Sequence, residues 1–201
     1  MKCEKHPHYQ GIRKPMNGCP VCLAIYDARQ AQKRIEILET QVKDLTKQDV
    51  VIVHPYTQRK IKFGLVSDTH LGSMFEELEF LKFAYKIFKR EKIANVYHAG
   101  DIIEGGKIYR GQEYETKYHG VDEQVDHCVK EYPQIEGITT YFIDGNHTLS
   151  FHNDAGVDVG EIISLYRKDL VYVGKEEANI ELENKSGRCI LRLVHPGGGT
   201  A

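Results

Sequence analysis

Six polar residues with metal-binding side chains follow apolar segments of the chain. Asp68 and His70 come directly after the apolar run 63–66, and a carboxylate beside an imidazole suits a divalent metal that takes both oxygen and nitrogen ligands. Because residues i and i+2 of an extended segment share a face, we expect these two side chains to point together off the end of a strand. The other four follow apolar runs of their own and are Asp101, Asn146, His147 and His195. Since the carboxyl ends of strands gather at one edge of a mixed sheet, we expect all six to converge.

The six side chains offer two carboxylates, one amide oxygen and three imidazoles. Such a donor set suits Mn²⁺, Fe or Zn²⁺. Gly100 and Gly145 stand directly before Asp101 and Asn146, and glycine lets the backbone turn sharply and approach a metal or a phosphate closely. Two metal ions about 3.5–4 Å apart can clamp a phosphate and supply a nucleophile at neutral pH. The pattern therefore predicts a two-metal phosphate site.

The elements that must position these residues alternate between strand and helix. Apolar runs predict strands at 62–67, 95–98, 139–143 and 170–173, helical spacing predicts helices at 76–91, 121–132 and 157–166, and two last strands at 179–183 and 189–194 are expected to pair antiparallel. The tyrosine-rich stretch 105–120 is typical of a loop or lid over a site. This order predicts a layered α/β domain over residues 50–201, with its site at the carboxyl ends of the strands.

The first 22 residues hold a second set of metal-binding side chains. Cys3 and His6 are separated by two residues, and Cys19 and Cys22 repeat that spacing further on. Two ligand pairs joined by a short loop match a tetrahedral, structural Zn²⁺ site, with His8 as the alternative fourth ligand. The loop has almost no apolar core, so the metal would have to supply its folding energy. The alternative is a disordered tail whose thiols are incidental. We name residues 1–22 the N-terminal knot.

Residues 23–49 are expected to form a helix. No glycine or proline occurs in this segment, and small or apolar residues recur at heptad spacing. They are Ala24, Ala28, Ala31, Ile35, Leu38, Val42 and Leu45. A two-stranded coiled coil would bury this seam and make the protein a homodimer through residues 24–45. The alternative is an amphipathic helix that lies on the main domain, residues 50–201.

The composition excludes several classes of protein. Of the 201 residues, 41% are hydrophobic and 28% are charged, which is ordinary for a soluble globular protein. No run of apolar residues is long enough to span a membrane and the N-terminus lacks the apolar core of a signal peptide, so we expect a cytoplasmic protein without a membrane partner. An odd number of cysteines that includes a Cys-x-x-Cys pair indicates reduced thiols rather than a disulfide framework. The formal net charge of -2 gives no overall basic field for nucleic acid, although a local patch is compatible with it.

The ordered motifs carry a resemblance to a known family. Asp68-x-His70, Gly100-Asp101, Gly145-Asn146-His147 and a later strand-end His195 resemble the motifs of calcineurin-like metallophosphoesterases, over roughly residues 60–201. The resemblance implies a four-layer α/β sandwich with a two-metal site in the loops at the strand ends. In this chain the sandwich would be C-terminally incomplete and preceded by a small zinc knot and a helix.

The family's functional residues carry over onto the matching positions. The resemblance divides the ligands between two metals, with Asp68 and His70 on the first, Asp101 on both, and Asn146 and His195 on the second. His147 would not bind metal but would face the phosphate and stabilise or protonate the leaving oxygen. Metal-bound hydroxide would attack in line, without a covalent phospho-enzyme.

The sequence departs from the family pattern in two places. An acid usually follows Gly-Asn-His and orients the imidazole, whereas Thr148 stands here, with Asp154 and the loop at His152 as candidate substitutes. The family's last motif, Gly-His-x-His, supplies one further ligand to each metal, and no counterpart follows His195 in the printed sequence. We therefore expect a truncated form of a longer protein, with weak metal binding and little activity for this chain alone.

Two functions of different classes fit these residues. The first is a two-metal phosphodiesterase or nuclease that acts on DNA or RNA, because small phosphomonoesterases rarely need a zinc knot or a dimerising helix. The second is a binding module, in which the knot and a coiled coil act as adaptors and the phosphoesterase domain is degenerate. Thr148 and the absent last motif support the second function. A phosphatase that acts on phosphoproteins is a third hypothesis, and no specific residue supports it.

Overall fold

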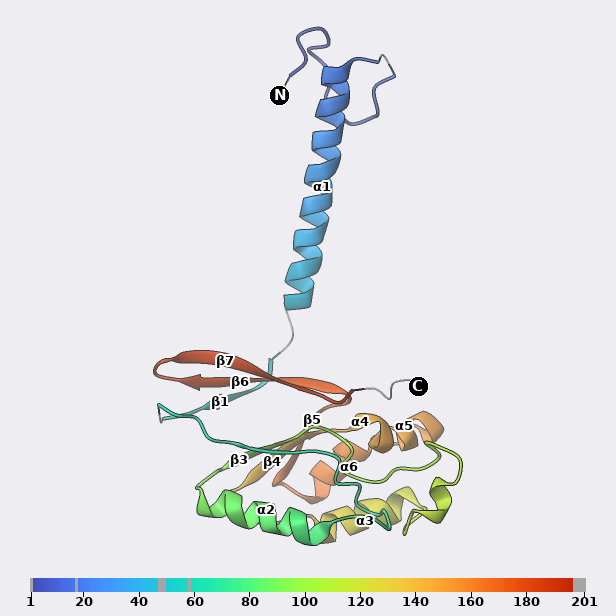
Figure 1. Ribbon diagram of the computed structural model, residues 1–201, viewed down its shortest axis with the longest axis vertical. Helices are drawn as coiled ribbons and strands as arrows, with labels where there is room; N and C mark the ends of the chain where they lie inside the picture. The colour runs from blue at the N-terminus through green and yellow to red at the C-terminus, as the bar shows by residue number, and fades with distance from the viewer. Residues whose placement is uncertain (1, 17, 47–49, 58, 197–201) are drawn as a thin grey trace. The chain divides into compact units, whose positions relative to one another are not determined.

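The computed structural model describes residues 2–16, 18–46, 50–57 and 59–196 (Figure 1). The chain divides into two compact units, Met1–Asp49 and Val50–Ala201. No helix among the described residues is both long and apolar enough to cross a membrane. The glycines at 197–199 lie outside the described residues.

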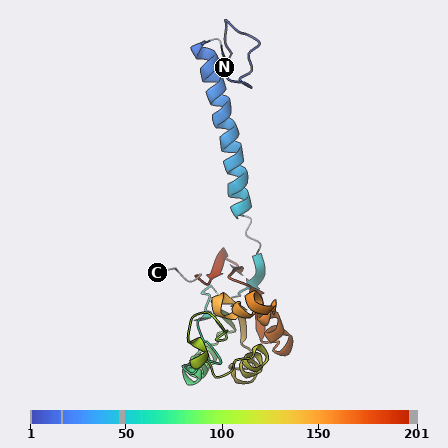
Figure 2. The same cartoon turned by 90° about the vertical axis from the view of Figure 1, so that its right-hand side faces the viewer.

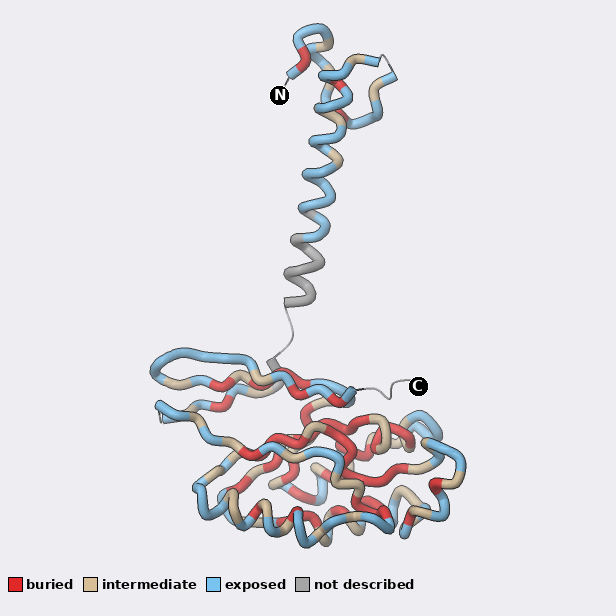
Figure 3. Tube along the Cα trace, in the orientation of Figure 1, coloured by how far each residue is buried: buried red, intermediate tan, exposed pale blue. Residues whose placement is uncertain are grey.

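The first unit consists of the N-terminal knot and helix α1, Pro20–Thr46. The helix begins three residues earlier than expected, because proline is well suited to the first helical position, where no backbone N–H is needed. The described part of α1 is largely exposed (Figure 3). Two members of the heptad seam, Ile35 and Leu38, are 47% and 51% exposed. The side chains of Val42 and Leu45 lie outside the described residues, and dimerisation through residues 24–45 stays a prediction.

The second unit is built on a four-stranded parallel sheet in the order β2-β3-β4-β5. Its strands are β2 Gly64–Val66, β3 Asn95–His98, β4 Thr139–Ile143 and β5 Leu170–Gly174. The long helices that follow these strands are α2 Leu78–Arg90, α3 Val121–Glu131 and α6 Val159–Tyr166. Their apolar faces pack on one side of the sheet and form the larger core cluster. Figure 2 shows α2 and α3 along their axes.

A second sheet lies on the opposite face of the first (Figure 1). It has the order β1-β6-β7, with β1 Val50–Pro55 parallel to β6 Glu177–Asn184, and β6 antiparallel to β7 Gly187–Val194. The inner faces of the two sheets share a core that includes Tyr97, Ile143, Ile180 and Leu193. Strands β3, β4 and β5 are thus covered on both faces, which explains their continuous apolar runs.

The architecture is the mixed α/β type that was expected, with helix, sheet and sheet stacked in layers. Within residues 50–57 and 59–196 no helix covers the outer face of the second sheet, so the described residues supply three layers of the sandwich. That outer face carries Val53, Ile190 and Val194, each about half exposed. Three short helices complete the unit, namely the 3-10 helix Gln112–Tyr114, α4 Gly145–Thr148 and α5 Ser150–Ala155.

Truncating the core at Phe142 tests this packing. Phe142 on β4 is fully buried beneath the helices. We expect Phe142→Ala to lower the free energy of unfolding by about 3–5 kcal/mol, because the lost ring leaves a cavity that the neighbours fill only in part. Chemical denaturation followed by circular dichroism measures the change. Phe80→Ala is the matched control, since Phe80 is 72% exposed and its loss should cost less than about 0.5 kcal/mol.

Candidate metal centre

Four loops meet beyond the carboxyl ends of β2, β3, β4 and β7. The backbone N–H of Asp68 donates to the Gly100 carbonyl at 3.0 Å, and that of His70 donates to the Asp101 carbonyl at 3.0 Å. The backbone N–H of Asp101 in turn donates to the carbonyl of Asp144 at 2.6 Å. These bonds continue the sheet pairing past the last strand residues, and they hold the motif loops at fixed positions relative to one another.

Asp68 and His70 do not lie on an extended segment, so the reason given for their shared direction is wrong. Their φ angles are 53° and 43°, in the left-handed region that side chains rarely adopt. The two side chains are nevertheless neighbours, with His70 Nε2 3.9 Å from Asp68 Oδ1. Asp101 shares the unusual backbone, with φ 56°. Such strained positions cluster at functional sites, where the surrounding structure enforces them.

Asp101 occupies the middle of the site. Its side chain is 3% exposed, and Oδ1 accepts the backbone N–H of His147 at 2.8 Å. The other oxygen, Oδ2, lies 3.2 Å from His195 Nε2 and 4.0 Å from His70 Nε2. One carboxylate oxygen therefore stands between two imidazoles that come from different sheets.

Two of the three motif histidines are oriented by hydrogen bonds from Nδ1. Carbonyl oxygens only accept hydrogen bonds, so His195 Nδ1–H donates to Ala99 at 2.9 Å and His147 Nδ1–H donates to Glu104 at 2.7 Å. Anchoring of Nδ1 in this way leaves Nε2 for a ligand and is the usual arrangement of metal-binding histidines. His70 Nδ1 lies 3.2 Å from the Glu104 carboxylate without forming a hydrogen bond to it.

Acceptor atoms face each other around His195, and this arrangement fits a metal ion. Asn146 Oδ1 lies 2.8 Å from His195 Nε2, whose other neighbour is the carboxylate of Asp101. Without a positive charge among them these atoms present lone pairs to one another, so the set requires a proton or a cation. Two groups of ligand atoms, each within 4.8 Å of one another, are present: Asp68, Asp101 and His195, and His70, Glu104 and His147. Carboxylate, amide and imidazole donors of this kind suit the divalent ions that the family implies.

The field of the site is negative. Burial lowers the pKa of His70, but its contact with Glu104 and the charges of Asp101 and Asp68 outweigh burial and raise the pKa above its ordinary value. The same charges that favour the imidazolium would stabilise a bound cation.

Glycine is required at two positions of the site. Gly100 has φ +105° and Gly145 has φ +80°, where side chains are strained. A β-carbon at Gly100 would overlap the ring of His195, and one at Gly145 would overlap the carboxylate of Asp101. The two glycines thus make the room that brings the side chains of the centre together.

Glu104 is a functional residue that sequence reasoning missed. It is 4% exposed, its carboxylate faces His70, and it accepts a hydrogen bond from Gln112 Nε2 at 2.9 Å. Burial raises the pKa of Glu104, but its contacts with His70 and Gln112 outweigh burial. The pKa of Glu104 therefore lies below its ordinary value. The sequence offered one signal for this residue, a single charged side chain directly after the apolar pair Ile102-Ile103. A carboxylate that follows buried residues is itself expected to be buried only if it has partners, which is typical of a functional site.

Replacing Glu104 with glutamine tests its role as a positioning residue for His70. The amide keeps the size of the side chain but loses the charge that orients the imidazole. We expect Glu104→Gln to weaken Mn²⁺ binding by about 10–100-fold, as is typical for a residue that supports a ligand. Isothermal titration calorimetry with Mn²⁺ measures the change, and Glu113→Gln, at an exposed position of the 3-10 helix Gln112–Tyr114, is the matched control. An unchanged affinity would show that Glu104 is merely structural.

The residues suggested as substitutes for the acid at position 148 do not orient His147. Asp154 is paired with Lys107 at 2.6 Å, and His152 lies 2.7 Å from Asp158. The backbone carbonyl of Glu104 fills that role. Thr148 itself is buried.

His98 supports the site from within the sheet. It is fully buried, and burial lowers its pKa to about 3, so it is neutral. Nδ1 accepts the backbone N–H of Gly100 at 3.2 Å, so Nε2 carries the proton and donates to Thr69 Oγ1 at 3.0 Å. The hydroxyl of Thr69 in turn donates a hydrogen bond to the carbonyl of Ile102 at 3.1 Å. These contacts make His98 a packed histidine that supports the motif loops.

A cavity of about 540 Å³ opens beside the centre. Asp68, His70 and His147 line its floor, and α2 supplies an apolar wall through Leu78, Leu81 and Ala84. Phe75 and Tyr109, which are 72% and 46% exposed, also line it. Tyr109 belongs to the expected lid 105–120 and is tied to it by a 2.6 Å hydrogen bond from its hydroxyl to Glu115. The cavity has the position that a substrate of the centre would need.

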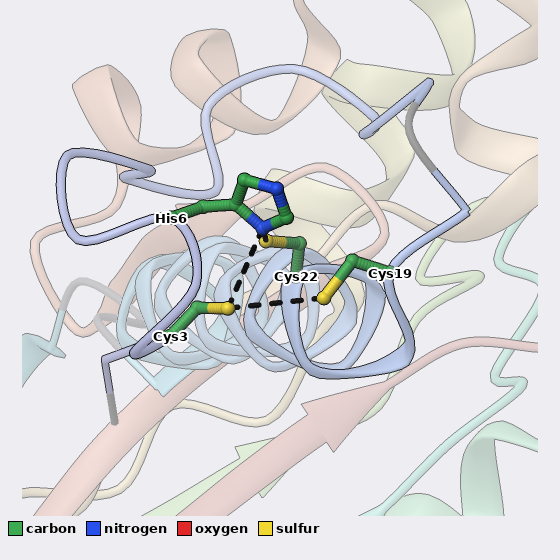
Figure 4. A group of neighbouring side chains, drawn as sticks. All are labelled: Cys3, His6, Cys19 and Cys22. Atoms are coloured by element: carbon green, nitrogen blue, oxygen red, sulfur yellow. Dashed lines mark hydrogen bonds between the residues drawn. The ribbon is translucent and has the colours of Figure 1, made fainter.

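The N-terminal knot brings together the four residues predicted for zinc. Cys3, His6, Cys19 and Cys22 present ligand atoms that all lie within 4.8 Å of one another (Figure 4). His8 is exposed and does not belong to this group.

The fold and the centre have the features of a metal-dependent phosphoesterase family. The sequence model of the calcineurin-like phosphoesterase family matches residues 61–196, which is more than half of the chain. The chain therefore belongs to this family. Over 117 residues the chain is 32% identical to the DNA polymerase II small subunit of Methanothermobacter thermautotrophicus. That match covers 49% of this chain and 24% of the archaeal protein, so the chain aligns with about a quarter of its relative.

Proposed function

We propose that residues 50–201 hydrolyse phosphodiester bonds of nucleic acid with two bound divalent ions, for which Mn²⁺ is the first candidate. The observation that carries the proposal is the position of Asp101, whose Oδ2 faces the unanchored nitrogens of both His195 and His70. A carboxylate between two sets of ligands is what a pair of ions about 3.5–4 Å apart requires.

The proposed ligands divide as the family motifs do. Asp68 and His70 would hold one ion, Asn146 and His195 would hold the other, and Asp101 would serve both. When bound, the ions supply Lewis-acid polarisation of the phosphate and a nucleophile at neutral pH. The residues of the chain supply the negative charge that retains the ions and the backbone that fixes their separation.

His147 has a separate role in this proposal. Its Nδ1–H is held by Glu104 and its ring packs edge-on against His70, with centroids 4.5 Å apart. The ring lines the cavity, and Nε2 is left for the substrate. A protonated Nε2 would donate to the leaving oxygen as the phosphoester bond breaks, which is the work of a general acid.

Three observations support nucleic acid as the substrate class. The cavity mouth carries the exposed aromatic rings of Phe75 and Tyr109, on which bases can stack. The archaeal relative is by its name a subunit of a DNA polymerase. The chain also joins the phosphoesterase unit to a cysteine-rich knot, a kind of module that commonly contacts nucleic acid or protein.

A binding module is the second candidate function. The observation that favours it is Thr148, which replaces the acid of the family motif and is buried with no hydrogen-bond partner for its hydroxyl. The name of the relative fits it as well, because a subunit can serve as a scaffold. In this case the centre would bind metal or nucleic acid without turnover.

A substrate panel separates these functions. The chain is incubated with saturating Mn²⁺ and bis-p-nitrophenyl phosphate, p-nitrophenyl phosphate, or labelled single- and double-stranded DNA. We expect slow hydrolysis of the diester and of DNA, in preference to the monoester, in keeping with the little activity expected for this chain alone. Preference for the monoester would reject the nuclease function. DNA binding without hydrolysis of any substrate would establish the binding module instead.

A further inference from the structure

The N-terminal knot gathers a second set of metal-binding side chains, apart from those of the phosphoesterase centre. Cys3 and Cys22 are 2% and 0% exposed, although the knot has almost no apolar core. Among described residues 2–16 and 18, Cys3 and Gly11 are the buried ones. Buried thiols therefore occupy the place that apolar side chains fill in a larger domain, and apolar packing alone cannot account for the order of this loop.

Three separations among the four ligand atoms lie close to the edges of a tetrahedron around zinc, the Cys22–His6 separation being the shortest. Zn–S bonds of about 2.3 Å and Zn–N bonds of about 2.0–2.1 Å give tetrahedral edges of about 3.8 Å between sulfurs and about 3.6 Å between sulfur and nitrogen. Cys3 Sγ lies 3.7 Å from Cys19 Sγ and 3.6 Å from His6 Nδ1, and Cys22 Sγ lies 3.2 Å from His6 Nδ1. The two sulfurs are far beyond the roughly 2.05 Å of a disulfide.

The backbone brings both ligand pairs to one point. The His6 N–H donates to the Cys3 carbonyl at 3.2 Å, which closes a tight turn between the first two ligands. Cys19 directly precedes α1, and Cys22 lies three residues further on, so both face the same side of the first helical turn.

Further contacts hold the loop against the helix. Gly11 has φ +69°, and a β-carbon there would lie 3.0 Å from the carbonyl oxygen of Ile25. Arg29 Nη1 donates to the carbonyl of Gln10 at 2.6 Å. The ligands therefore stand at one end of an interface between the loop and the first turns of α1.

We propose that Cys3, His6 Nδ1, Cys19 and Cys22 bind one Zn²⁺ in a closed, structural site that folds the N-terminal loop onto α1. Three thiolates and one imidazole form a soft donor set that prefers zinc to the ions of an oxygen-rich centre. Four protein ligands leave no position open for water or substrate, so the site does not take part in hydrolysis. The structural assignment selects His6 over His8 as the fourth ligand.

Cobalt substitution of the full chain tests this site separately from the phosphoesterase centre. The protein is stripped of metal under reducing conditions and titrated with Co²⁺. Thiolate ligands give a near-ultraviolet sulfur-to-cobalt charge-transfer band, which carboxylate and imidazole ligands do not give. We expect the band to saturate at one equivalent, to disappear when one equivalent of Zn²⁺ is added, and to be lost in Cys22→Ser.

Matched variants identify the ligands. Cys189→Ser, at an exposed cysteine outside the knot, should leave the band and the zinc content unchanged. His6→Ala should weaken cobalt binding, whereas His6→Cys should retain one equivalent and strengthen the band. His8→Ala should have no effect.

Two results would overturn the proposal. One is a wild-type protein without a thiolate-to-cobalt band, and the other is equal zinc content in wild type and Cys22→Ser by mass spectrometry of the metals. Amide hydrogen exchange provides a second readout. Chelation should remove protection from residues 2–25 and leave that of β3 and β4 intact, and unchanged protection in residues 2–25 would contradict a folding role for the metal.

Discussion

Replacing Asp101 with asparagine should remove metal binding at the phosphoesterase centre while the fold remains intact. The amide has the size of the carboxylate, and asparagine tolerates the left-handed backbone at this position. Its oxygen can still accept the backbone N–H of His147. The lost charge, however, served both ions, so hydrolysis of a diester should fall by on the order of 10³-fold or more, beyond the roughly 10–100-fold typical of residues that only support a ligand.

Metal analysis and kinetics together measure this effect. Asp126→Asn on α3 is the matched control, because its side chain is 60% exposed and far from the motif loops in sequence. The control should keep wild-type metal content and rate. An Asp101→Asn protein that retains two equivalents of Mn²⁺ would refute the bridging role of Asp101, whatever its activity.

Replacing His147 with asparagine should separate catalysis from metal binding. The variant keeps a side-chain N–H near the position of Nδ1 but has no group in place of Nε2. We expect kcat to fall by about 10²–10⁴-fold, the usual contribution of a general acid, with KM and metal content close to those of the wild type. Steady-state kinetics and metal analysis on the same preparation measure both quantities.

His119→Asn is the matched control for that variant, because His119 is exposed. A substrate with a good leaving group gives a second check. An activated aryl leaving group needs no proton, so the loss in rate should be smaller for bis-p-nitrophenyl phosphate than for DNA. Loss of bound metal from His147→Asn would instead make His147 a ligand, and its role as an acid would then be withdrawn.

The limits of β3 and β4 were predictable to the residue, whereas the edge strand β1 was not predicted. Both faces of β3 and β4 are covered, so adjacent apolar side chains of these strands fill the cores on either side of the sheet and give a clear local signal. Strand β1 was missed, since Val50–Pro55 follows a long polar helix and ends in histidine and proline. Its parallel pairing with β6, far along the chain, leaves no local signal.

The candidate ligands were predictable by type and order, whereas their geometry was not. Apolar runs that end in aspartate or histidine located Asp68, Asp101 and His195, and the structure brings these residues together. The left-handed backbone of Asp68 could not be inferred, because it results from bonds to a loop more than 30 residues away. The contact between the Glu104 carbonyl and His147 could not be inferred from the sequence either, since every residue has a backbone carbonyl.

The most direct measurement is anomalous diffraction from a crystal of the chain soaked with Mn²⁺. The account predicts two Mn²⁺ peaks about 3.5–4 Å apart, with Asp101 between them and with His70 and His195 on opposite sides. A single ion, or ions bound elsewhere on the molecule, would contradict the two-metal centre on which the proposed function rests.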